Sequence, residues 1–158
     1  MFHKKIDKQS IREATGVTDE ALLDRLVELN LNGELMAAFK LLPVIEVAWA
    51  DGVVDEKEVR AVLSAAEQHG IRPGDKAYAM LETRLREGPS KPTRKLWYHY
   101  AETLKKTLSP RELEEFRKDL LDICERVARA SGGLLNLAFN ISPNERRVME
   151  IIERALTP

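Results

Sequence analysis

Apolar positions recur along this chain at intervals of three and four residues, the spacing of helix faces. The pattern predicts helices over residues 18–29, 34–50, 56–69, 75–88, 93–108, 110–130 and 143–156. Gly, Pro, Ser or Asn stands at most of the boundaries between them, and no stretch shows the alternation of a convincing strand. The sequence therefore predicts an all-α protein, a single bundle of about seven helices.

The segment 34–50 is apolar at nearly every position, which is typical of a helix that packs on most sides. Pro43 interrupts it and should kink or restart the helix. Residues 1–17 mix Phe2 and Ile6 with lysines and lack a continuous apolar stripe. We therefore expect a mobile N-terminal arm over residues 1–17 and one helical domain over residues 18–158.

A short acidic turn joins the second and third predicted helices. Asp55 and Glu58 have the spacing of a capping box, in which each side chain bonds the backbone of the other residue. Oxygen ligands from several carboxylates suit a hard cation such as calcium or magnesium. Asp51, Asp55 and Glu58 are therefore candidate metal ligands, with Glu46 in reserve. Capping alone also accounts for Asp55 and Glu58, so this structural explanation stays open.

A second copy of this pattern occurs near the C-terminus. Ile141-Ser142-x-x-Glu145 repeats Val54-Asp55-x-x-Glu58, and each glutamate precedes an apolar helix stripe. Two such helix pairs could pack about a pseudo-twofold axis. Ser131 stands where the first copy has Asp51, so a second metal site is not expected and Glu145 is read as a cap.

The first motif resembles the hallmark of the TerB-like tellurite-resistance family, a helix running into Ala-x-Ala-Asp-Gly-x-Val-x-x-x-Glu. The matching residues are Ala48, Ala50, Asp51, Gly52, Val54 and Glu58. The resemblance covers about residues 35–156. It implies a TerB-like helical bundle in a bacterial protein linked to tellurite resistance and stress response. It further implies that acidic residues bind a divalent metal and that no enzymatic reaction is carried out.

The composition of the chain argues against several classes of function. The formal net charge of -1, with 32% charged residues, gives no overall field that attracts nucleic acid or an anionic membrane. A basic strip near Arg94 and Tyr98 is ordinary for a helix exterior, so nucleic-acid binding is not expected. Cys124 is the single cysteine and predicts a buried thiol. No catalytic motif stands out, so we do not expect an enzyme.

Two further expectations concern location and partners. No apolar run has the length of a signal peptide's core or a membrane span, which predicts a cytoplasmic protein. The connection Leu134–Ile141 is unusually apolar and could cover the core or contact another subunit. The alternative function is therefore a protein-interaction or scaffold domain that binds no metal.

Overall fold

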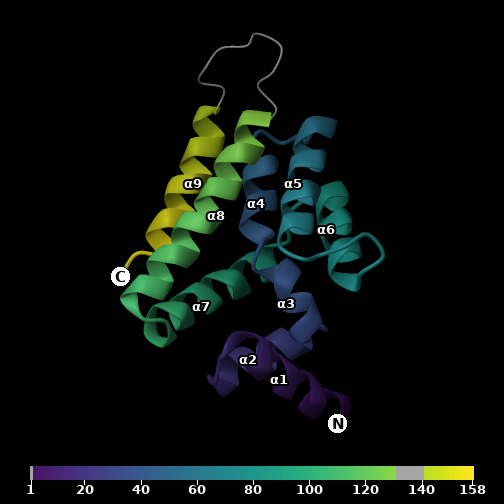
Figure 1. Ribbon diagram of the computed structural model, residues 1–158, viewed down its shortest axis with the longest axis vertical. Coiled ribbons are helices and arrows are strands. Elements are labelled where there is room, and N and C mark those ends of the chain that lie inside the picture. The colour runs from purple at the N-terminus through teal and green to yellow at the C-terminus, as the bar shows by residue number, and fades with distance from the viewer. Residues whose placement is uncertain (1, 131–140) are drawn as a thin grey trace.

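The structure is a computed structural model that describes residues 2–130 and 141–158, and over these residues it contains helices and no strand (Figure 1). The helices are α1 (Phe2–Thr15), α2 (Glu20–Glu28), α3 (Gly33–Phe39), α4 (Leu42–Ala48), α5 (Glu56–Gln68), α6 (Lys76–Glu87), α7 (Lys91–Thr107), α8 (Pro110–Ala130) and α9 (Pro143–Ala155). The predicted all-α bundle is confirmed.

The central apolar segment is split into two helices. α3 ends at Phe39 and α4 begins at Leu42, with Pro43 in its first turn, where a missing backbone N–H costs nothing. Pro43 therefore restarts the helix, as its position predicts. Six of the seven residues of α4 are buried, and the helix contacts α5, α6, α7, α8 and α9. α4 is the element around which the upper part of the molecule in Figure 1 packs.

Aromatic and sulfur side chains complete the core. The rings of Phe39 and Tyr100 meet edge to face with centroids 5.6 Å apart, joining α3 to α7. The indole Nε1 of Trp49 donates to the carbonyl of Leu85 at 3.0 Å and so fixes the end of α4 against α6. Cys124 is fully buried, as predicted, and its burial raises the pKa of the thiol.

The expected N-terminal arm is instead a packed helix. α1 lies against α3 and α2, and its Ile11 is fully buried. Ser10 Oγ accepts a hydrogen bond of 2.9 Å from the backbone N–H of Gly33, the first residue of α3. The expectation failed because α1 has few apolar positions, and the contacts that hold it come from a distant segment. The first predicted helix, expected from residue 18, also begins later, because Asp19 caps α2 and Glu20 is its first residue.

Within residues 2–130 and 141–158, no helix is both long enough and apolar enough to cross a lipid bilayer.

The close approach of α1 and α3 gives a test of this docking. A Cβ built on Gly33 would lie 2.5 Å from the carbonyl oxygen of Ser10, which is backbone and cannot rotate away. We expect Gly33→Ala to lower the free energy of unfolding by about 1–3 kcal/mol through steric strain. Urea denaturation measures the loss, and hydrogen exchange should show faster exchange throughout α1.

Glu34→Ala, next to Gly33 and exposed, is the control and should change the unfolding free energy by less than about 0.5 kcal/mol. An unchanged stability of Gly33→Ala would contradict the tight packing of α1 on α3.

Candidate functional site

The chain turns sharply between α4 and α5. Gly52 takes the left-handed conformation, with φ of 85°, and its N–H donates to the carbonyl of Trp49 at 2.8 Å. Asp55 then caps α5: its Oδ1 accepts from the N–H of Glu58 at 2.8 Å, and its own N–H donates to Glu58 Oε1 at 3.2 Å. The predicted capping box is present and holds both carboxylates at the start of α5.

The start of α9 is built in the same way and lies beside this turn. Ser142 Oγ accepts from the N–H of Glu145 at 3.1 Å, and the N–H of Ser142 donates to Glu145 Oε1 at 2.8 Å. Asp51 joins the two helix starts, because its Oδ1 accepts from Ser142 Oγ at 3.1 Å and from Asn144 Nδ2 at 3.0 Å. We call Asp51, Asp55, Glu58 and Glu145 together the acidic corner.

Burial and mutual repulsion disturb the two glutamates of the acidic corner. Glu58 is 4% exposed and Glu145 is 2% exposed, whereas Asp51 and Asp55 are exposed. Burial is the largest cause that raises the pKa of Glu58, to about 7, and the charges of Asp55, Glu145 and Asp51 raise it further. Burial also raises the pKa of Glu145, with contributions from Asp51 and Asp55. Hydrogen bonds from the two caps act in the opposite direction but do not cancel these effects.

No described basic side chain neutralises the acidic corner. Within residues 2–130 and 141–158, none of the four carboxylates forms an ion pair with Lys, Arg or His. The hydrogen bonds of the two caps and of the Asp51 bridge use Oδ1 or Oε1 of each carboxylate. The second oxygen of each carboxylate takes no part in these bonds. The corner thus combines carboxylate oxygens with unbalanced negative charge, which is the chemistry that hard cations require.

The side-chain positions themselves do not form a coordination sphere. In the part of the chain that the structure describes, no group of three or more His, Cys, Asp or Glu is arranged to hold a metal ion. A cation at the acidic corner would therefore require the carboxylates to rotate from the positions that the caps give them.

The predicted ligand set is only partly brought together. Asp51, Asp55 and Glu58 lie at one corner, as the sequence indicated, but Glu46 does not. Glu46 Oε1 instead accepts from Arg94 Nε at 2.6 Å, which ties α4 to α7. Glu145 was predicted only as a cap, and the structure adds it to the cluster. The repeated motif could have pointed to Glu145, because matched helix pairs bring matched corners together.

The alternative interaction segment is largely outside the described residues. Of Leu134–Ile141, the structure describes Ile141 alone, which is partly buried and packs on the core. The interaction alternative stays a prediction.

Comparison with known proteins adds no relative. No protein-family model matches this chain, and neither a curated protein nor a solved structure does. The resemblance to the TerB-like family therefore depends on the motif residues of the sequence alone.

The raised pKa of Glu58 predicts a pH-dependent stability. The folded protein binds this proton up to about pH 7, whereas a glutamate in the unfolded chain releases it near its ordinary pKa of 4.5. The contribution of Glu58 to the free energy of unfolding therefore falls as pH rises from 4.5 to 7. Gln at position 58 has no charge but keeps an oxygen for the cap. We compare the unfolding free energy of Glu58→Gln with that of wild type at each pH. We expect this difference to favour the variant by about 1–2 kcal/mol more at pH 8 than at pH 5.

Urea denaturation of chelator-treated protein at both pH values measures this difference. Glu56→Gln changes an exposed carboxylate in the same helical turn and should show no such dependence on pH. Equal effects of Glu58→Gln at pH 5 and pH 8 would mean that the Glu58 carboxyl titrates normally.

Proposed function

We propose that this chain is a non-enzymatic, TerB-like helical domain that binds a divalent cation, calcium or magnesium, at the acidic corner. One observation carries the proposal: two buried glutamates, from the starts of α5 and α9, lie at one corner with Asp51 and Asp55 and have no ion-pair partner among the described residues. Glu58 and Glu145 each lie close enough to the other carboxylates for those charges to raise their pKa values. A cation at this corner would attract all four carboxylates and favour the loss of the protons that Glu58 and Glu145 hold.

The acidic corner supplies the kind of ligand atom that calcium and magnesium prefer. Asp51, Asp55, Glu58 and Glu145 supply oxygen atoms only, which favours calcium or magnesium over zinc or copper. Carboxylates bind a cation in their deprotonated form, and the pKa values of Glu58 and Glu145 are both raised, so the cation should bind more tightly as pH rises. Since the ligands come from the α4–α5 turn and from the start of α9, the cation would also hold these two segments together.

The proposed cellular role follows from the family resemblance. It is a metal-responsive or scaffolding part in a bacterial stress response of the tellurite-resistance kind, in the cytoplasm. In such a role, the occupancy of the acidic corner would change how firmly α9 is held against the α4–α5 turn.

Calorimetric titration of calcium, magnesium, manganese and zinc into chelator-treated protein tests the proposal. We expect saturable binding of calcium or magnesium and weaker binding by Asp51→Asn, Glu58→Gln and Glu145→Gln. Each variant keeps an oxygen where the wild-type residue accepts its cap or bridge hydrogen bond. At a cation concentration of about 100 times Kd, the wild type should gain about 2.7 kcal/mol of stability.

Two matched variants serve as controls. Glu56→Gln and Glu46→Gln each remove one negative charge nearby in the sequence but outside the acidic corner, so cation binding should be unchanged. Absence of binding by the wild type, or full binding by all three corner variants, would contradict the proposal.

A further inference from the structure

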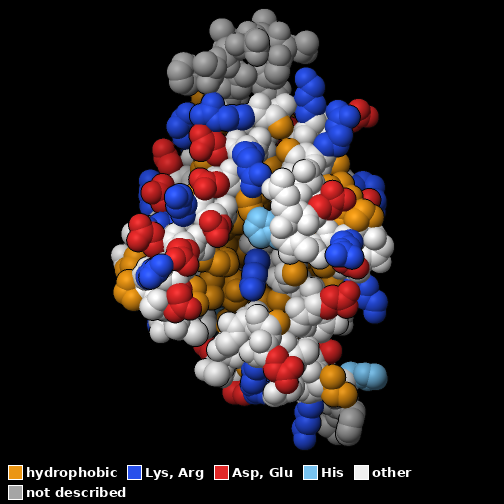
Figure 2. Space-filling model, viewed as in Figure 1, with side chains coloured by type: hydrophobic (Ala, Val, Ile, Leu, Met, Phe, Trp, Pro, Cys, Tyr) orange, Lys and Arg blue, Asp and Glu red, His pale blue; other side chains and the backbone are white. Residues whose placement is uncertain are grey.

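A cavity of about 280 Å³ opens between α3, the end of α5 and α8. Its polar lining residues are Lys40, His69 and Asp119, and the remaining lining residues are apolar. Figure 2 shows hydrophobic side chains at the bottom of a hollow beside α8, with basic side chains at its mouth. The volume is just under the range of small-molecule pockets, about 300–1,000 Å³. None of these residues belongs to the acidic corner.

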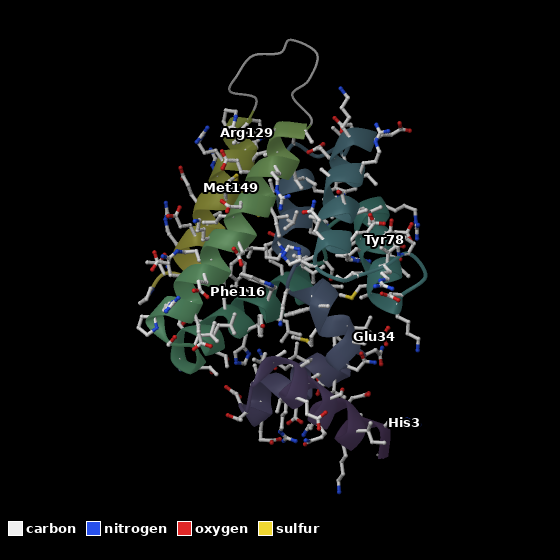
Figure 3. All side chains as sticks on the ribbon, viewed as in Figure 1. His3, Glu34, Tyr78, Phe116, Arg129 and Met149 are labelled. Carbon is white, nitrogen blue, oxygen red and sulfur yellow. The ribbon has the colours of Figure 1, made fainter. Side chains whose placement is uncertain are left out.

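The floor of the cavity is apolar. Phe116, Leu120 and Ile123 lie on one face of α8, at steps of four and three residues, and Phe116 is marked in Figure 3. Leu120 and Ile123 are 4% and 2% exposed, so neighbouring side chains already cover most of their surface. One turn of helix, about 5.4 Å long and about 10–12 Å across with its side chains, would need more than the 280 Å³ that the cavity offers. An extended alkyl chain is the apolar group that fits.

Lys40 places a positive charge beside this floor. The side chain is partly buried, and burial lowers the pKa of its amine because no counter-ion compensates the loss of water. No described carboxylate forms an ion pair with Lys40, and this includes Asp119 on the opposite wall. Lys40 also caps the C-terminus of α3, where a cation is favourable, but a helix end does not replace a counter-ion.

His69 adds a second polar group to the lining. Its Nδ1 lies 2.9 Å from the carbonyl oxygen of Ala65, and an N–H there donates to that oxygen and fixes the ring. Nε2 is the ring nitrogen left for a further partner. The lining contains no arginine, the residue suited to holding a phosphate through two parallel bonds, and one lysine suits a singly charged head.

We propose that this cavity binds a single-chain amphiphile with a carboxylate head. The carboxylate pairs with the Lys40 ammonium group at the mouth, and the alkyl chain lies along Leu41, Leu120 and Ile123. The charge on Lys40 selects an anion, and the small volume of the cavity selects a chain over a helix. This binding is independent of a cation at the acidic corner.

Titration of the full-length protein with n-decanoate below its micelle concentration tests the proposal. We expect one saturable site by calorimetry, with shifts of the methyl resonances of Leu120 and Ile123 by NMR. Lys40→Met keeps the apolar stem and removes the charge, and it should weaken decanoate binding roughly tenfold or more. Decyltrimethylammonium, with a similar chain and the opposite charge, should bind the wild type at least roughly tenfold more weakly than decanoate.

Two further variants keep the test decisive. Ala37→Phe fills the exposed mouth of the cavity next to Lys40 but keeps the lysine, and it should abolish binding while the fold is retained. Lys57→Met removes an exposed lysine elsewhere and should bind like wild type. The proposal is overturned if decanoate shows no saturable binding, if Lys40→Met binds as well as wild type, or if the cationic chain binds equally.

Discussion

The burial of α4 is the constraint on which the rest of the structure depends. A helix that is apolar on nearly every side must be surrounded, and α5, α6, α7, α8 and α9 all contact it. Because α4 ends at Ala48 and the chain turns at Gly52, the next helix has to start at the surface beside α9. The position of the acidic corner is therefore a result of how α4 is enclosed.

Enclosure also explains why the corner is electrostatically unfavourable. Helix starts attract negative charge, since their backbone N–H groups point outward, and each cap here supplies a carboxylate for that reason. Two such starts placed side by side bring Glu58 and Glu145 into a shared, mostly dry space. Each carboxylate is well suited to its own helix, and the repulsion arises only from the tertiary arrangement.

Local features of the fold could be predicted from the sequence, whereas contacts between distant segments could not. The caps at Asp55 and Ser142 and the restart at Pro43 depend on a few neighbouring residues and were confirmed. The docking of α1 depends on the contact of Ser10 with Gly33, and the pairing of Glu46 with Arg94 spans 48 residues. No local sequence pattern predicts either contact. The pseudo-twofold relation of the two helix pairs stays a prediction.

The bridge from Asp51 to Ser142 and Asn144 joins residues 91 and 93 positions apart. A pairing this distant closes late, because the intervening chain must first be brought together at an entropic cost. On the ribosome, α4 would leave the exit tunnel well before α9 has been made. Until α9 arrives, the apolar side of α4 that it covers stays exposed, and such exposed apolar surface is prone to aggregation.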